Sequence, residues 1–440
     1  MMSDAGAVVA ITDTDRARVV VGDCLEVLAS MSPDSIDACV TDPPYGLEFM
    51  HGNGVAWDAA VPDATYWRAV YRVLKPGAHL VAFSGTRTYH HLATAIEAAG
   101  FELRDMLCWL HGMGFPKAGD VGKRIDADAG AARAWSGFAA ALKPAVEPIV
   151  LARKPCTDAV HRNVVQYGTG ALNIDGCRVG VDGGTQRSGA SPTGASGWRT
   201  GHDVLPIAAG RWPANVLHDG SNDVLGIFPA TIAAVRSQRG ESAGVATTFS
   251  APDGIHGHDD HGGSAARFFY CAKASVSDRD HGLADMALHE AVGVYNLRHG
   301  AAAIAAGTAT APRRNLHPTV KPTALMRHLV RLVGHVGKLA DDAIIIDPFA
   351  GTMSTGRACV LESMRFVGIE REVAYAAIGL ARLHAAQRDG EASPGAAMTA
   401  PTTLPPRHST PAHGAVMTPA TLTQRRAALA DQLPLFDVEA

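Results

Sequence analysis

Hydrophobic and polar positions in the first 150 residues alternate between two periods. Short apolar or β-branched runs of strand length are separated by stretches with apolar residues at helical spacing. This pattern predicts strands at 18–22, 38–40, 78–83, 103–110 and 147–152, helices at 66–75 and 88–99, and a helical segment after Asp23. Alternating strands and helices favour an α/β fold with a doubly wound, mostly parallel sheet.

The pattern dissolves between about residues 154 and 310, where Gly, Ser, His and short apolar pieces follow one another without a sustained period. We expect a loop-rich inserted region there, with 180–201 mobile. Strands at 343–346 and 366–369, a helix that begins at Pro322, and helices at 352–362 and 373–384 then resume the α/β pattern. The Ala/Pro/Thr-rich stretch beyond about residue 388 predicts disorder. The predicted divisions of the chain are 1–153 and 313–387 for the two parts of the α/β pattern, 154–312 for the inserted region and 388–440 for the tail.

Composition adds few constraints. The 440 residues are 47% hydrophobic and 19% charged, with a formal net charge of −4, so contact with a polyanion would require a local basic cluster. Seven cysteines without a Cys-x-x-Cys pair indicate reduced thiols. No apolar run reaches membrane-spanning length, and the first residues lack the pattern of a signal peptide. We therefore expect a soluble, cytoplasmic protein without a membrane partner.

Four predicted strands are followed by, or end at, an acidic residue: Asp23, Asp42, Asp347 and Glu370. Ligands of open parallel sheets bind at the carboxyl ends of the strands, where four acids can line one crevice. Each acid alone can equally cap the helix that follows it, because Asp is a common N-cap.

The first chemical motif is Asp42-Pro43-Pro44-Tyr45, directly after an apolar strand. The prolines stiffen the loop and leave their carbonyls free to accept hydrogen bonds. Asp42 is a second acceptor, and Tyr45 offers a flat ring face. These features suit a planar base that carries an amino group; the alternative is a proline-stiffened turn with no ligand.

The second motif runs from Asp347 to Gly356 and has small residues at a predicted strand–turn–helix junction. Such a turn allows a ligand to approach the backbone, and the start of the helix favours an anionic group. Glu370, one strand later, is placed to bind the hydroxyls of a ribose.

Thr41 to Gly46 resembles the catalytic motif of the amino-group DNA methyltransferases, Asp347 to Gly351 their S-adenosylmethionine motif, and His317 to Pro322 the segment before it. The order of these motifs resembles the circularly permuted β group, in which a target-recognition region lies between them. Residues 142–149, 210–216 and 268–275 resemble phage and prophage members. The resemblance spans residues 18–385 and implies a Rossmann-like, S-adenosylmethionine-dependent methyltransferase fold.

The resemblance implies a role for each matching residue. Asp42 and the carbonyl of Pro43 would hold the amino group of a flipped base, and Tyr45 would stack on its ring, so the catalytic candidates are Asp42, Pro43, Pro44 and Tyr45. Asp347 would bind the amino end of the cofactor's methionine, Glu370 the ribose, Asp23 the adenine, and Thr319 and Lys321 would lie near the methionine end. The cofactor candidates are Asp23, Thr319, Lys321, Asp347, Pro348, Phe349, Ala350, Gly351, Thr352 and Glu370.

Methyl transfer to an exocyclic amino nitrogen needs positioning and electrostatics but no covalent intermediate. In this family an aspartate at the head of the motif is commoner in adenine-N6 enzymes and a serine in cytosine-N4 enzymes, so Asp42 favours adenine in duplex DNA, reached by base flipping. Cytosine-N4 methylation is the alternative. A second alternative is a non-catalytic, sequence-specific DNA-binding protein, because Met353 stands where the family usually has glycine, and methionine would hinder a turn that needs φ > 0.

The remaining candidates concern partners. Phosphate contacts are predicted for Arg211, Arg267, Lys273, Arg313 and Arg314. The histidines at 256, 258 and 261 are interpreted as a solvated loop, and no metal site is expected. Gln432 to Phe436 resembles the peptide by which bacterial replication and repair proteins bind the sliding clamp, and a homodimer is possible because relatives of the β group often dimerise.

Overall fold

The protein is described here as a computed structural model. The described residues are 9–14, 16–47, 57–112, 114, 119–125, 129–180, 184–187, 204–207, 210–232, 237–238, 255–256, 262–272, 276–288, 314–334 and 343–392. All seven cysteines are free thiols. Within these ranges, no helix is both long and apolar enough to cross a membrane.

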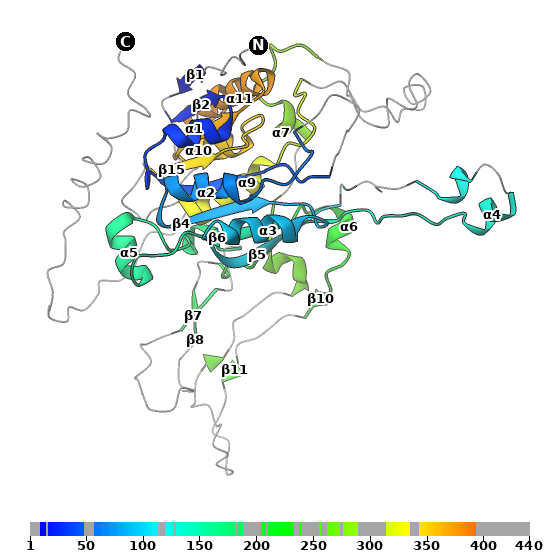
Figure 1. The fold of residues 1–440 in the computed structure, drawn as a ribbon. Helices are drawn as coiled ribbons and strands as arrows, with labels where there is room; N and C mark the ends of the chain where they lie inside the picture. The colour runs from blue at the N-terminus through cyan, green and yellow to red at the C-terminus, as the bar shows by residue number, and fades with distance from the viewer. Residues whose placement is uncertain are drawn as a thin grey trace, which may run out of the picture.

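A ten-stranded sheet forms the centre of the described chain (Figure 1). In spatial order its strands are β1 (Val9–Thr14), β2 (Ala17–Val21), β16 (Arg365–Glu370), β15 (Ile344–Asp347), β3 (Ile36–Thr41), β4 (Leu74–Phe83), β6 (Val146–Arg153), β5 (Glu102–Leu110), β9 (Val216–His218) and β14 (Tyr270–Cys271). The strands from β2 to β4 are parallel, whereas β6 is antiparallel to both β4 and β5. The predicted α/β fold with a mostly parallel sheet is confirmed.

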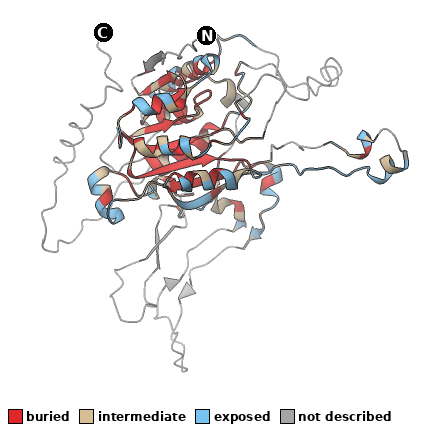
Figure 2. Ribbon diagram, viewed as in Figure 1, coloured by how far each residue is buried: buried red, intermediate tan, exposed pale blue. Residues whose placement is uncertain are grey.

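Helices cover both faces of this sheet (Figure 1). One face packs against α1 (Cys24–Ser30), α2 (Ala64–Val73) and α3 (Tyr89–Ala98), and the other against α9 (Thr323–Gly334), α10 (Ser354–Leu361) and α11 (Val373–Ala392). Successive strand residues point to opposite faces, so Cys39 joins one core and Val40 the other. The strands are therefore buried on both sides, as Figure 2 shows in red.

The predicted boundaries differ most from the observed ones at two places. The helix predicted to end at residue 75 ends at Val73, and β4 begins at Leu74 and runs through Pro76 and Gly77. Its pairing with β3 shifts register between Ile36 and Ala38, and this irregularity accommodates the proline, which has no N–H to donate. Near the other end of the described chain, α11 continues to Ala392, past the predicted helix end at 384 and the predicted start of the disordered tail at 388.

The region predicted as a loop-rich insertion contributes β9 and β14 to the edge of the main sheet. The described part of this region also contains the helices α5 (Val160–Tyr167), α6 (Asn222–Leu225) and α7 (Val276–Asp280), and short helical turns at Asp175–Cys177 and Ala265–Phe268. Three separate strand pairs join β7 (Gly184–Arg187) to β8 (Val204–Ile207), β10 (Ala230–Thr231) to β13 (Gly263–Ser264), and β11 (Ser237–Gln238) to β12 (Ile255–His256). Thus β7 lies within the stretch that was predicted to be mobile.

A further segment, between β5 and β6, carries the helical turn Gly122–Arg124 and α4 (Ala129–Ala134) and projects away from the sheet (Figure 1). Trp135 and Phe138 on this segment pack edge-to-face at 5.2 Å between ring centroids, yet both remain more than half exposed.

Candidate active site

Four acidic side chains lie at one edge of the sheet. β2, β16, β15 and β3 are consecutive, parallel neighbours, so their carboxyl ends lie along the same edge. Asp23 follows β2, Glu370 ends β16, Asp347 ends β15 and Asp42 follows β3. Since ligands of open parallel sheets bind beside this edge, the row of acids marks the candidate site.

Asp347 joins the two motifs that the sequence analysis singled out. The hydroxyl of Thr41, 306 positions earlier, donates to Asp347 Oδ1 at 2.6 Å, and the hydroxyl of Thr355 in α10 donates to Oδ2 at 2.6 Å. The Asp347 residue is only 2% exposed, and burial raises the pKa of its carboxyl to about 6. Asp347 therefore lies beneath the surface of the site, where it ties the Asp42–Tyr45 turn after β3 to the turn after β15 that contains Gly351, which we call the glycine turn.

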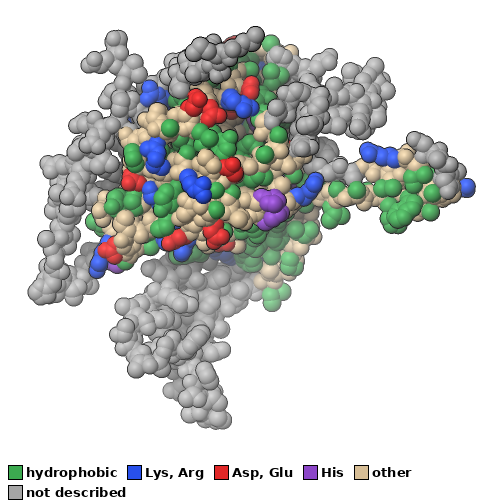
Figure 3. Space-filling model, in the orientation of Figure 1, with side chains coloured by type: hydrophobic (Ala, Val, Ile, Leu, Met, Phe, Trp, Pro, Cys, Tyr) green, Lys and Arg blue, Asp and Glu red, His purple; other side chains and the backbone are tan. Residues whose placement is uncertain are grey.

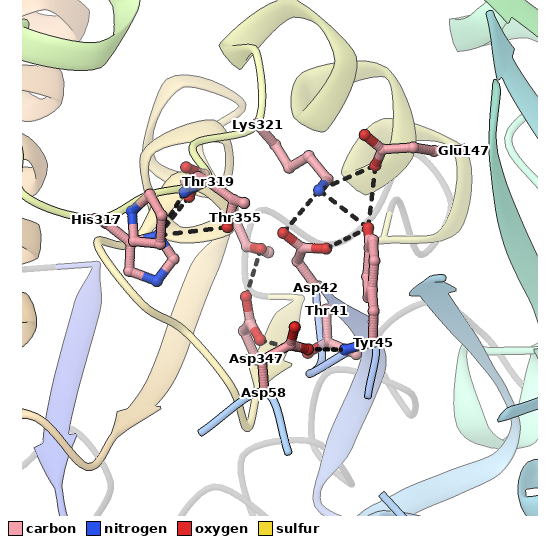
Figure 4. A network of polar contacts seen from close by, with 12 residues as sticks. Thr41, Asp42, Tyr45, Asp58, Glu147, His317, Thr319, Lys321, Asp347 and Thr355 are labelled. Atoms are coloured by element: carbon pink, nitrogen blue, oxygen red, sulfur yellow. Dashed lines mark hydrogen bonds and ion pairs between the residues drawn. The ribbon is translucent and has the colours of Figure 1, made fainter. Parts of the chain in front are cut away.

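Around Asp42 four side chains form a polar cluster, which we call the Asp42 cluster: Asp42, Tyr45, Glu147 and Lys321 (Figure 4). The ammonium of Lys321 lies 2.8 Å from Asp42 Oδ2 and 3.1 Å from Glu147 Oε2. The Tyr45 hydroxyl lies 2.8 Å from Asp42 Oδ1 and 3.0 Å from Glu147 Oε2. Each carboxylate thus contacts both the lysine and the tyrosine.

Burial and charge act in opposite directions on these groups. Burial raises the pKa of Asp42 above its ordinary value, although Lys321 acts against this effect. Burial also acts to raise the pKa of Glu147, but Lys321 and His111 outweigh it and the pKa is lowered. Burial acts to lower the pKa of Lys321, and the two carboxylates together raise it instead. The cluster is therefore built around a charged lysine.

The loop that carries Tyr45 is held by its backbone. Asp58 is 5% exposed, and its Oδ1 accepts from the backbone N–H groups of Tyr45 at 2.7 Å and Gly46 at 3.0 Å. In the same loop, Pro43 is buried and Pro44 is half-buried. The turn after β3 is thus fixed from below by a carboxylate as well as by its prolines.

Glu370 lies over the glycine turn. Its Oε2 accepts from the backbone N–H of Gly351 at 2.7 Å, and its Oε1 from that of Glu372 at 2.8 Å. Burial raises the pKa of the Glu370 carboxyl to about 7, with these backbone bonds acting against the shift. Asp23, which follows the neighbouring strand β2, accepts from Leu25 N at 2.8 Å and caps α1, which is the structural role that its sequence position also allowed.

Met353 adopts the left-handed backbone conformation that its position was suspected to need, with φ at +59°. That conformation costs a residue other than glycine roughly 1–2 kcal/mol. The Met353 residue is fully buried in the core behind the turn. A Cβ at Gly368 in β16 would lie 2.6 Å from its sulfur, and a Cβ at Gly379 in α11 would collide with its Cγ. Two glycines therefore provide the space that methionine occupies.

Residues of the segment before α9 lie in two different parts of the site. Lys321 is directed into the Asp42 cluster, whereas Thr319 is exposed and its backbone oxygen contacts His317 Nδ1. The His317 ring stacks on Trp57 with centroids 5.6 Å apart and meets Tyr375 edge-on at 4.7 Å. Burial lowers the pKa of His317 to about 4.

The other predicted cofactor residues form the turn itself. Pro348, Ala350 and Gly351 are buried, and the Phe349 ring packs against the rings of Tyr66 and Trp67 in α2. The hydroxyl of Thr352 lies 3.1 Å from the amide of Asn315 and 3.2 Å from the buried guanidinium of Arg382. These side chains shape and anchor the turn.

Sequence reasoning assigned no role to Glu147, Asp58, Trp57 or His317. Glu147 stands at the start of a predicted strand and within a segment that resembles phage proteins, and nothing in the local pattern distinguishes it from a surface acid. Lys321 was expected near the cofactor's methionine, and its closest partners are Asp42 and Glu147.

Among the predicted phosphate contacts, the guanidinium groups of Arg211 and Arg267 both lie over the Phe268 ring, 4.7 and 4.2 Å from its centroid. Arg314 donates from its backbone to Asp280 and from Nε to Met286 O. Lys273 and Arg313 lie outside the described residues, as do His258, His261 and the stretch Gln432 to Phe436. Acidic and basic side chains are interspersed on the face shown in Figure 3.

Within the described ranges, no cluster of three or more His, Cys, Asp or Glu side chains is arranged to hold a metal ion.

Comparison with known proteins gives one family match and several partial relatives. Residues 279–380 match the N6_N4_Mtase family, described as DNA methylase. The chain is 37% identical over 70 residues to DNA adenine methyltransferase YhdJ of Escherichia coli (strain K12), which covers 16% of this chain and 22% of that protein. It is 31% identical over 112 residues to the type II methyltransferase M.HindIII of Haemophilus influenzae, covering 23% and 35%. The matches therefore span well under half the length of these relatives.

Among solved structures, the cytosine-N4-specific PvuII DNA methyltransferase aligns with 83% of this chain and 86% of its own chain, at 15% identity and a TM-score of 0.41.

Proposed function

We propose that the chain is a DNA methyltransferase that transfers a methyl group from S-adenosylmethionine to the N6 amino group of adenine in duplex DNA. One observation carries the proposal: the Asp42–Tyr45 turn and the glycine turn follow neighbouring parallel strands, although some 300 residues separate them, and Thr41 bonds directly to Asp347. The match of residues 279–380 to a DNA methylase family supports the same reaction class.

The cofactor fits the residues at the glycine turn. Each Glu370 oxygen accepts one backbone N–H and keeps a second lone pair, so the carboxylate can still accept from ribose hydroxyls. Met353 does not obstruct this use of the turn, because its side chain is buried on the far side between two glycines. S-adenosylmethionine supplies an electrophilic methyl group bonded to a positively charged sulfur.

The chain's own residues supply positioning. An exocyclic amino nitrogen is a weak nucleophile because its lone pair is delocalised into the ring. Asp42 and the Pro43 carbonyl can accept its two hydrogens and direct the lone pair toward the methyl group, and Tyr45 can stack on the ring of a flipped base. Positioning and electrostatics account for such catalysis without a covalent enzyme intermediate. The buried thiol of Cys39, whose pKa burial raises well above its ordinary value, is not needed.

The order of the motifs supports a circularly permuted arrangement. The strand that carries the catalytic turn comes first in the chain, and the strand that carries the glycine turn lies beside it in the sheet but comes near residue 347. The region between them is then the target-recognition region. The aspartate at position 42 favours adenine over cytosine.

The test is to incubate the purified protein with labelled S-adenosylmethionine and duplex DNA, digest the DNA and identify the labelled nucleoside. We expect N6-methyladenine. N4-methylcytosine would replace the adenine assignment. A protein that binds both duplex DNA and the cofactor but labels neither base would contradict the proposed reaction.

A further inference from the structure

Lys321 has no spare hydrogen-bonding capacity for a ligand. It is 6% exposed, and its three N–H donors face three oxygens: Asp42 Oδ2 at 2.8 Å, the Tyr45 hydroxyl at 3.1 Å and Glu147 Oε2 at 3.1 Å. The Phe83 ring closes the remaining side, 4.8 Å from Nζ. The charge of this lysine is therefore directed entirely into the Asp42 cluster.

The cluster joins three elements that are far apart in the chain. Asp42 follows β3, Glu147 lies in β6, and Lys321 lies just before α9 (Figure 4). β4 separates β3 from β6 in the sheet, so Lys321 and Tyr45 bridge from Asp42 across β4 to Glu147. A bridge of this kind fixes the orientation of the Asp42 carboxylate before any base arrives.

We propose that Lys321 and Glu147 are positioning residues for the methyl transfer: Lys321 keeps Asp42 ionised and in one rotamer, and Glu147 holds both Lys321 and the Tyr45 hydroxyl in place. This inference rests on the proposed function. It assigns Glu147 a role and moves Lys321 from the cofactor end of the site to the base end.

The charges around Asp42 predict the direction in which each substitution should shift the pKa of its carboxyl. A neighbouring positive charge stabilises an ionised carboxylate and a neighbouring negative charge destabilises it. Lys321 is the positive group; Glu147 beside it and Asp347 behind it are negative; the Tyr45 hydroxyl donates to the carboxylate. His111 faces Glu147 at 3.7 Å and Asp58 binds the backbone of Tyr45. Removing the lysine and removing the glutamate must therefore shift the pKa of Asp42 in opposite directions.

The experiment measures the titration of Asp42 directly. Full-length protein is labelled with ¹³C-carboxyl aspartate, and the Asp42 resonance is identified by its loss in Asp42→Asn. We expect Lys321→Met to raise the midpoint by about 1–3 pH units and Glu147→Gln to lower it, while Lys321→Arg stays close to the wild type. Lys75→Met is the matched control: it removes another lysine with little exposure, which pairs with Asp37 at 2.6 Å at the opposite end of β3, and should leave the midpoint of Asp42 unchanged.

Methyl transfer provides the second readout. The acid limb of the pH–rate profile should follow the titration, moving up in Lys321→Met and down in Glu147→Gln, and Lys321→Met should lower kcat by about 100-fold, the scale of a misplaced reacting group. Midpoints that stay unchanged, or shift in the same direction in both variants, would overturn the inference even if the wild type methylates DNA. Opposite shifts in a protein that methylates no DNA would support the charge arrangement and reject the proposed function.

Discussion

The two ends of the candidate site are built by different means. The Asp42 cluster consists of charged and polar side chains from three elements, and its geometry depends on how they neutralise one another. The glycine turn depends on backbone conformation: Gly351 and Met353 both have positive φ, and Glu370 binds the backbone of Gly351 rather than another side chain. We infer that the base end is sensitive to charge and the cofactor end to shape, and substitutions can separate the two.

The largest effect is expected at the base end. Asp42→Ala removes the carboxylate that would hold the amino group, and losing one such hydrogen-bonding partner typically lowers kcat by about 10²–10³-fold. Single-turnover methyl transfer measures this loss, and isothermal titration should show unchanged cofactor binding. Asp158→Ala, a substitution at an exposed acid that contacts Arg162 and the backbone N–H of Ala159, is the control and should leave kcat unchanged. If Asp42→Ala retained full methyl-transfer activity, Asp42 would not be a catalytic residue.

At the cofactor end, Met353→Gly should change stability far more than binding. Losing a buried methionine side chain costs about 2–5 kcal/mol, and relief of the left-handed conformation returns about 1–2 kcal/mol. We expect a net decrease in the free energy of unfolding, measured by urea denaturation, with cofactor affinity almost unchanged. A large gain in affinity would instead mean that methionine obstructs the turn, as its departure from the family pattern first suggested.

Glu370 should make the cofactor end sensitive to pH. Its pKa in the folded protein, about 7, lies above that of an ordinary glutamate, so its contribution to stability is fully present below the unfolded value and is lost as pH rises through about 7. The contribution of Glu370 to the free energy of unfolding should therefore decrease by about 1–3 kcal/mol between pH 5 and pH 8. Cofactor affinity should change in the opposite sense, because ribose hydroxyls need the ionised carboxylate as acceptor.

Glu370→Gln tests both halves of that prediction. The variant should lose this part of the pH dependence of stability and keep the part due to Asp347, whose pKa is also raised, to about 6. Its cofactor affinity should no longer change through pH 7. If wild type and variant have parallel stability curves across this range, Glu370 does not titrate as its burial implies.

The smallest effect is a coupling between Met353 and the glycine opposite it. Gly379→Ala should destabilise the wild type, because the added Cβ collides with Met353 Cγ, and should be tolerated better in Met353→Gly. Residues in direct contact typically show interaction energies of about 0.5–3 kcal/mol in such a double-mutant cycle. Gly390→Ala, at a position where a Cβ meets nothing within 4 Å, is the matched glycine control. If the effects of Gly379→Ala and Met353→Gly on stability were additive, the Met353 side chain would not lie against Gly379.

The fold was largely predictable because its signals are local. Strands such as β3 and β15 are short apolar runs, and the acids that follow them mark where each strand ends. The misplaced boundary at Val73 arose because Pro76-Gly77 ordinarily stops an element, whereas here the register irregularity with β3 absorbs it. Similarly, β9 and β14 are only three and two residues long, and their place in the sheet comes from long-range pairing that carries no local pattern.

The sequence by itself determined the two turns, the acids at the strand ends and the α/β order, because turn chemistry and hydrophobic period depend on neighbouring residues. It also identified Met353 as the residue to question. Only the tertiary structure decided that Lys321 contacts Asp42, that Glu147 completes this contact, and that Gly368 and Gly379 make room for Met353. Each of those facts joins elements remote in the chain, and such a pairing is set by packing across the whole sheet.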